Sequence, residues 1–312
     1  MFDRWIDGGG AGRIRLILVA ICICFVLPTG LIAETCVEKQ NPATLLDTGQ
    51  SFFYKGEWQE ARFCFQEMQR RQPEDPAGYF LESMIPFWEY YFVKQDSELA
   101  DQFFDVSEKA IKRAEILLES DPDQSAVIAM LSGLYGYRSM VASEEGAVRE
   151  AFRSGRRGYE YTQQLMSLEI NSPEIHIGRG MYHYMAGSVP GSLRWLARLF
   201  GLRGEKQTGV DYLEEAARSD SYTRLDARLI LSVIYKREGL EESALHHLNA
   251  LLSNYEENRI FLLLKADLLQ ELGRTEEAGK LYHQLMERSD EHWSRLTAEV
   301  RERNRKLSER PS

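Results

Sequence analysis

The pattern of apolar and polar positions predicts a succession of short, paired helices. Two stretches show the pair most clearly, "SVIYKREGLEESALHHLNALL" at 232–252 and "KADLLQELGRTEEAGKLYHQLM" at 265–286, and they align without a gap. Gly239 and Gly273 occupy the position that ends the first helix, where a left-handed residue is needed. The two glycines are 34 residues apart, a period typical of helical repeats.

The start of the chain carries the same period. Asn41-Pro42 and Asp75-Pro76 each place a capping residue before a proline suited to the first helical position, and the prolines are 34 residues apart. The stretch between them, "GQSFFYKGEWQEARFCFQEMQRRQP", resembles a tetratricopeptide unit. The residues that carry this resemblance are Gly49, Phe52, Gly56, Ala61, Phe65, Met68 and Pro73. With the two units near the other end, it implies an array of helix pairs.

The middle of the chain is stretched relative to that period. Gly133-x-Tyr135-x-Tyr137 and Gly180-x-Tyr182-x-Tyr184 share one pattern at a separation of 47 residues. Gly158 and Gly209 follow 25 and 29 residues after the first glycines and are predicted to open the second helices. These units therefore contain either insertions or lengthened helices.

Residues 120–220 also resemble the inclusion-body-clearance family of tetratricopeptide proteins and related secreted bacterial proteins. The matching segments are Gly180-Met-Tyr182, Val189-Pro190-Gly191, the apolar stretch 193–200, Gly201-Leu-Arg-Gly204-Glu205 and Gly209-Val-Asp-Tyr-Leu213. Glu205 stands where that family more often has Asp. The resemblance implies a fold and a binding role, and no reaction.

We therefore predict an all-α protein, a right-handed superhelix of about six tetratricopeptide-like helix pairs over residues 34–290, with insertions in the middle pairs. Residues 291–312 turn polar and predict a charged C-terminal helix or tail that caps the array.

Residues 1–33 are predicted to be a signal peptide, so the chain is expected to be exported to the periplasm. Arginines precede an apolar run at 16–27 that Pro28 ends, and the run is too short to cross a hydrocarbon core of ~30 Å. The alternative is an uncleaved membrane anchor with the domain outside the cytoplasm. After cleavage Cys36 and Cys64 remain, and they either form a disulfide or stay as free thiols.

The net charge of −10 argues against a nucleic-acid partner, because no excess of Lys and Arg neutralises phosphates. No catalytic motif, metal-binding pattern or cofactor motif stands out, so we predict a protein that is not an enzyme. The six histidines are scattered and are expected in surface or capping positions.

The candidate partner-binding residues lie late in the predicted first helices, which line the concave side of such a superhelix. They are Tyr137, Arg138, Tyr184, Lys236 and Arg237. Tyr and Arg are common interface anchors. The alternative for the tyrosines is packing between helices, with hydroxyls bonded to the backbone.

Two further segments carry candidate sites. In 192–203, Leu193, Leu196, Leu199 and Phe200 share one helical face, with Trp195 beside them and arginines elsewhere. This helix either docks on an anionic membrane surface or acidic partner, or packs on the superhelix with its arginines solvated. The aromatic run 86–92 predicts core packing over a ligand pocket, and Pro86 predicts a kink or a helix boundary.

The predicted function is a non-enzymatic exported scaffold that binds a protein or peptide partner in its concave face. The alternative is a carrier of a small apolar ligand, like the periplasmic helical-repeat proteins that accompany tripartite ATP-independent transporters. An apolar lining with few charges favours the carrier, and a charged open groove favours the protein partner. A third possibility is an adaptor that rests on a membrane through 192–203.

Overall fold

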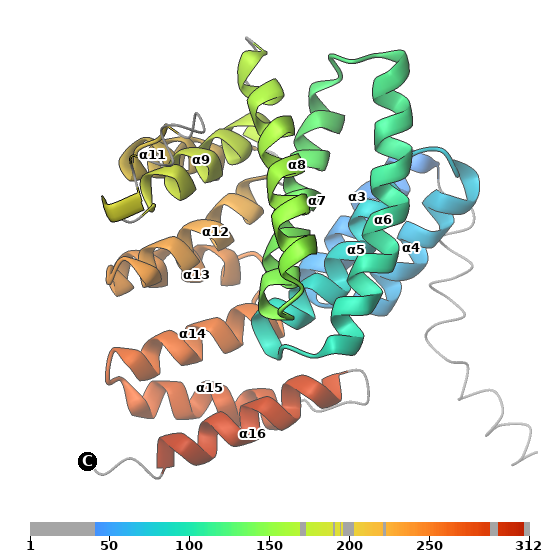
Figure 1. The fold of residues 1–312 in the computed structure, drawn as a ribbon. Helices are drawn as coiled ribbons and strands as arrows, with labels where there is room; N and C mark the ends of the chain where they lie inside the picture. The colour runs from blue at the N-terminus through green and yellow to red at the C-terminus, as the bar shows by residue number, and fades with distance from the viewer. Residues whose placement is uncertain are drawn as a thin grey trace, which may run out of the picture.

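The chain folds into α-helices throughout the part that this computed structural model describes, which is residues 41–168, 173–189, 191–193, 195, 203–220, 223–287 and 293–308 (Figure 1). The helices are α3 (Pro42–Lys55), α4 (Trp58–Arg71), α5 (Ala77–Trp88), α6 (Ser97–Ser120), α7 (Ser125–Glu144), α8 (Val148–Ser167), α9 (Pro173–Gly187), α11 (Lys206–Ala217), α12 (Thr223–Arg237), α13 (Glu241–Leu252), α14 (Arg259–Glu271), α15 (Thr275–Glu287) and α16 (Ser294–Ser308). A π-helix, η1 (Glu89–Val93), follows α5, and a 3₁₀ turn, η2 (Gly191–Leu193), follows α9. These ranges contain no strand, so the prediction of an all-α protein is confirmed.

Helices pack mainly on their neighbours in sequence. The largest contacts join α3 to α4, α5 to α6, α7 to α8, α9 to α11, α12 to α13 and α14 to α15. In Figure 1 the last three of these pairs stack from top to bottom on one side, and α3 to α8 occupy the other side. The arrangement is consistent with a helical repeat, and the right-handed superhelix stays a prediction.

The predicted helix ends are confirmed at both ends of the chain. Asn41 caps α3, with its Oδ1 accepting a hydrogen bond from the Thr44 backbone N–H at 2.9 Å. Gly239 and Gly273 adopt φ of 72° and 74°, and Gly56 adopts 81°. An L-residue would be strained at these left-handed positions, so glycine reverses the chain between paired helices at low cost.

The prediction that Gly158 opens a helix is wrong. Gly158 lies in the middle of α8, and the turn before α8 is made by Gly146, with φ of 70°. A Cβ on Gly158 would lie 3.2 Å from the backbone nitrogen of Gly136, so this glycine lets α7 and α8 cross closely. Both helices are 20 residues long, so this unit is stretched by lengthened helices. Gly209 lies in the first turn of α11, three residues beyond its start.

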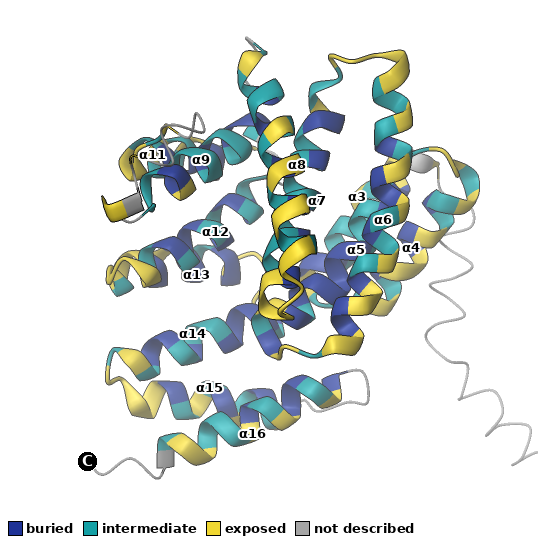
Figure 2. Cartoon of the chain, in the orientation of Figure 1, coloured by how far each residue is buried: buried dark blue, intermediate teal, exposed yellow. Residues whose placement is uncertain are grey.

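Pro86 does not end a helix. It lies inside α5, which runs on to Trp88 and then widens into η1, where the Lys94 N–H bonds to the Glu89 carbonyl at 3.1 Å. Phe87 and Trp88 are both buried, and the core interpretation of this aromatic run is confirmed for them. Figure 2 shows that buried residues follow the sides of the helices that face other helices.

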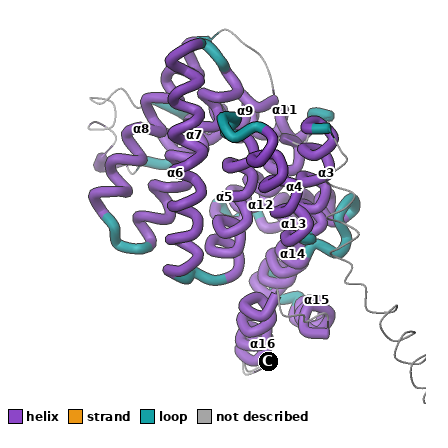
Figure 3. Tube along the Cα trace, turned by 90° about the vertical axis from the view of Figure 1, so that its right-hand side faces the viewer, coloured by secondary structure: helices purple, strands orange, loops and turns teal. Residues whose placement is uncertain are grey.

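The two ends of the helical chain contact each other. The Asn258 side-chain amide, at the start of α14, donates to the Tyr54 carbonyl of α3 at 2.8 Å. Trp58 and Trp293 have ring centroids 4.5 Å apart, and Arg295 of α16 bonds to Glu98 of α6 at 2.8 Å. The Tyr54 hydroxyl of α3 also donates to Asp226 of α12 at 2.6 Å, so α3 contacts both α12 and α14. In Figure 3, α15 and α16 extend below the other helices.

The C-terminal helix predicted in 291–312 is confirmed as α16, Ser294–Ser308. It is more than a polar cap, because Leu296 and Val300 are buried in the main core. None of the helices in the described part of the chain combines the length and apolar character that a membrane crossing requires.

Candidate functional site at the inner aromatic cluster

Seven aromatic side chains gather where α3, α5 and α7 meet the turn before α14 and α14 itself. This inner aromatic cluster consists of five rings in contact, Phe53, Tyr54, Trp88, Tyr255 and Phe261, and of the neighbouring pair Phe87 and Tyr137, which adjoins them through the interaction of Tyr137 with Tyr54 and Asp226. The ring centroids of Phe53 and Trp88 are 4.6 Å apart, and those of Phe87 and Tyr137 are 4.5 Å apart. Tyr54 lies 5.9 Å from Trp88 and 5.8 Å from Tyr255. These separations are those of interacting aromatic pairs.

One carboxylate lies next to these aromatic side chains. Asp226, in the first turn of α12, accepts a hydrogen bond from the Tyr54 hydroxyl on its Oδ1 at 2.6 Å, a length typical of a charge-assisted bond. Burial raises the pKa of Asp226 from 3.8 to about 6, and the hydrogen bond from Tyr54 only partly opposes this. Burial, and then the charge of Asp226, raise the pKa of Tyr54 and of Tyr137 well above 10.

Two oxygens of the cluster have no partner. Within the described ranges, neither Asp226 Oδ2 nor the Tyr137 hydroxyl makes a hydrogen bond, and Asp226 forms no ion pair. Neither oxygen is fully covered by protein, and both residues are only half-buried, whereas Tyr54 and Trp88 are 4% and 5% exposed. This edge of the cluster thus presents an acceptor and a hydroxyl that are free to bond a ligand.

The structure does not bring the five predicted partner-binding residues together. Tyr137 belongs to the inner aromatic cluster. Arg138, one position on and so about 100° around the helix, is buried against α6 and α8 and bonds the Phe104 carbonyl at 3.0 Å. It also lies 3.3 Å from both Glu108 and Glu150. Its guanidinium is therefore occupied within the protein.

The other three predicted residues lie elsewhere. Tyr184 is buried and donates to Glu238 at 2.8 Å. Lys236 and Arg237 are exposed at the end of α12, and Lys236 pairs with Glu271 at 2.9 Å. These two basic side chains are exposed at the end of α12 and lie apart from the inner aromatic cluster.

The alternative predicted for the tyrosines, packing between helices with hydroxyls bonded to the backbone, is confirmed for Tyr182, whose hydroxyl accepts the Arg203 backbone N–H at 3.2 Å, and is wrong for Tyr135 and Tyr184. Their hydroxyls donate to carboxylates instead, because helical carbonyls are already used within their own helices. The pairs are Tyr90–Glu145, Tyr135–Glu115, Tyr184–Glu238, Tyr235–Glu214 and Tyr282–Asp267, at 2.7–2.9 Å. Sequence reasoning singled out Tyr135 and Tyr184 but missed Glu115 and Glu238, because these acids lie far away in the sequence.

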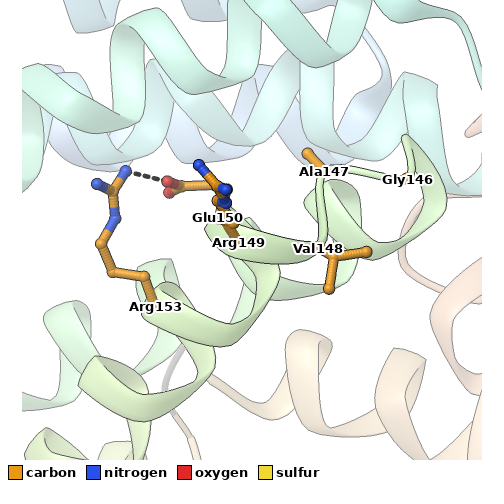
Figure 4. A pocket seen from close by; sticks show the side chains of 6 residues that line it. All are labelled: Gly146, Ala147, Val148, Arg149, Glu150 and Arg153. Carbon is orange, nitrogen blue, oxygen red and sulfur yellow. Dashed lines mark hydrogen bonds and ion pairs between the residues drawn. The ribbon is translucent and has the colours of Figure 1, made fainter.

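A second candidate surface lies at the start of α8. An open hollow of about 540 Å³ is lined by the turn between α7 and α8 and by the first residues of α8. Figure 4 shows its six lining residues, among which Glu150 pairs with Arg153. Beside it Val148 and Phe152 are 74% and 75% exposed, and Arg149 has no ion-pair partner in the described ranges. The signal in the sequence is an apolar pair four residues apart, Val148 and Phe152, each followed directly by an arginine.

Several predicted residues lie outside the described part of the chain. Leu196, Leu199 and Phe200 are among them, as are the signal segment, Cys36 and the side chain of Leu193. Trp195 is described and is 66% exposed. Cys64 is fully buried, and burial raises the pKa of its thiol to about 11. The disulfide with Cys36 stays a prediction.

The expectation that the histidines occupy surface positions is wrong for two of them. His176 and His247 are buried. His247 stacks on Tyr235, with centroids 5.5 Å apart, and its Nε2 lies 3.2 Å from Glu214. Burial lowers the pKa of His247, while the nearby carboxylate opposes that shift.

Among the residues that the structure describes, no three His, Cys, Asp or Glu side chains gather closely enough to hold a metal ion. Comparison of the chain with known protein families and with curated proteins finds no match.

Proposed function

We propose that the chain is an exported, non-enzymatic binding protein that holds a small organic ligand at the inner aromatic cluster. Its fold would be a tetratricopeptide-like right-handed superhelix of about six helix pairs. The single observation that supports this best is the pair of unpartnered, accessible oxygens on Asp226 and Tyr137 within aromatic surroundings. Small-ligand sites typically combine a mostly apolar lining with a few polar groups that fix orientation.

Two features favour a small ligand over an extended protein segment. The inner faces of α3, α12 and α14 contact one another through Tyr54, Asp226 and Asn258, which leaves less open length for a peptide. The side chains gathered there are aromatic, with a single carboxylate. That composition matches the apolar lining expected of the carrier.

Native mass spectrometry of the gently purified protein tests this proposal. We expect an added mass of a few hundred daltons that disappears on denaturation. The Tyr137→Ala variant should carry less of it. Tyr159→Ala should carry as much as the wild type, because Tyr159 stacks on Tyr182 outside the cluster. A bare polypeptide mass in the folded wild type would argue against a carrier.

The second candidate function is the binding of an acidic protein segment at the start of α8. Val148 and Phe152 are apolar, exposed and next to Arg149, which has no ion-pair partner in the described ranges. A photo-crosslinker in place of Phe152 should give a discrete adduct that Arg149→Glu abolishes. A crosslinker in place of Ile116, which is exposed on α6, is the control. An adduct that survives charge reversal, or one made of two copies of this chain, would contradict an acidic partner.

A further inference from the structure

We propose that Asp226 anchors a positively charged organic ammonium group of the ligand, enclosed by the aromatic rings of the inner cluster. This inference rests on the proposed function and adds the chemical class of the ligand.

The negative charge of Asp226 is not balanced by any described residue of the protein. Asp226 is crowded by protein atoms, accepts only one hydrogen bond and forms no ion pair with the residues that the structure describes. An ionised carboxylate that is half-buried among protein atoms loses part of its hydration, and a cation that pairs with it offsets this cost. The nearest hydrogen-bond donor, Tyr54, is neutral and therefore supplies a bond but no charge. A ligand that brings its own positive charge would complete the site.

The aromatic rings near Asp226 can also attract a positive charge. Tyr54 bonds the carboxylate directly, and it packs against Trp88 and Tyr255 at centroid distances of 5.9 and 5.8 Å. The face of an aromatic ring attracts a cation, and aromatic cages are a known means of binding quaternary and methylated ammonium groups. Tyr137 adds a hydroxyl that accepts an N–H where the ammonium carries one.

The side chains of this site disfavour a hard metal ion such as Ca²⁺ or Mg²⁺ as the ligand. Ca²⁺ and Mg²⁺ take six or more oxygen ligands, largely from carboxylates, carbonyls and water. The site has one carboxylate, and the other side chains of the cluster offer aromatic rings and tyrosine hydroxyls. An organic ammonium fits these side chains because it gains from ring faces and apolar contact as well as from the charge.

Matched pairs of probes test the inference on the full chain. The first pair is choline and its uncharged carbon analogue, 3,3-dimethylbutanol. The second is phenethylammonium and 2-phenylethanol. Binding is measured by calorimetry and by tryptophan fluorescence, to which Trp88 of the cluster contributes. We expect at least one ammonium to bind about tenfold or more tightly than its neutral analogue, since tenfold corresponds to 1.4 kcal/mol.

Two variants test whether the charge of Asp226 causes the preference for an ammonium over its neutral analogue. Asp226→Asn keeps an oxygen for the Tyr54 hydroxyl but removes the charge, and it should abolish the preference for the ammonium. Asp101→Asn removes an exposed carboxylate on α6 and should leave the preference unchanged. Thermal unfolding of both variants shows that they are folded.

The outcomes separate this inference from the proposed function. If neither ammonium is preferred by the wild type, or if the preference survives in Asp226→Asn, the ammonium anchor is overturned. If the neutral analogues bind as well as the ammonium ions, the small-ligand site of the proposed function is supported, and the inference that it selects a positive charge is wrong. If no probe binds and the native mass is that of the bare chain, both proposals fail.

Discussion

Replacing Asp226 by Asn should stabilise the ligand-free protein near neutral pH. Burial raises the pKa of this carboxyl from 3.8 to about 6, so the folded state opposes ionisation that the unfolded state permits. A group with a raised folded pKa contributes stability at low pH that is lost as the pH rises through the folded value. The variant has no ionisation at this position and escapes that loss.

The magnitude follows from the displacement of the pKa. One pH unit corresponds to 1.36 kcal/mol, so a displacement of about two units amounts to about 3 kcal/mol at most. Asp226 is half-buried, and water that reaches it reduces this cost. We therefore expect the free energy of unfolding of Asp226→Asn, relative to wild type, to increase by about 1–3 kcal/mol between about pH 3 and pH 7, a window that spans the unfolded and the folded pKa of Asp226.

Urea unfolding followed by circular dichroism, at several pH values in that window, measures the difference. The samples must show the bare polypeptide mass, because a bound ligand would stabilise the wild type. Asp101→Asn is the control and should follow the wild type at every pH, since its carboxylate is exposed. A difference between Asp226→Asn and wild type that does not change with pH would refute the reasoning. So would a variant that loses stability as the pH rises, because it would mean that the folded protein stabilises the ionised carboxylate.

Four further predictions test the fold and the signal segment. Gly146→Ala should cost about 1–2 kcal/mol in urea unfolding, because φ is 70° there, whereas Gly136→Ala in α7 should be neutral or stabilising, since an added Cβ meets no atom within 4 Å. Arg138→Met should cost about 3 kcal/mol by the same assay, because it leaves buried acceptors unpaired; a loss below about 1 kcal/mol would contradict the buried network. The thiol of Cys64 should resist alkylation until the protein unfolds, because it is buried and its pKa is raised to about 11; peptide mapping showing rapid native modification would disprove this. N-terminal sequencing of the exported protein should begin at Glu34, and an intact Met1 would favour the retained anchor.

A buried acid that costs folding stability fits a functional site, because binding residues are often unfavourable for folding alone. The same Asp226→Asn variant should gain stability and lose ammonium binding, and a purely structural acid would not show both effects.

Local signals in the sequence were enough to predict the helices near both ends of the chain. The 34-residue spacing of Gly239 and Gly273, and the cap at Asn41, are local signals. Helix periodicity and left-handed glycines act within a few residues, so they can be recognised without tertiary contacts. The turn at Gly146 was missed because α7 and α8 are longer than the repeat that the ends of the chain suggested.

The candidate site could not be predicted from the sequence, because its residues come from distant helices. Asp226 looks in sequence like an ordinary acid in the first turn of a helix, where the dipole favours it. Tyr54, which bonds it, is 172 residues away. Tyr137 was recognised as a candidate, but its neighbour Arg138 is buried on another side of α7. Which residues meet depends on how distant helices pack, and local periodicity does not encode that packing. Burial also sets the pKa of Asp226, and burial exists only once α3, α7 and α12 have come together.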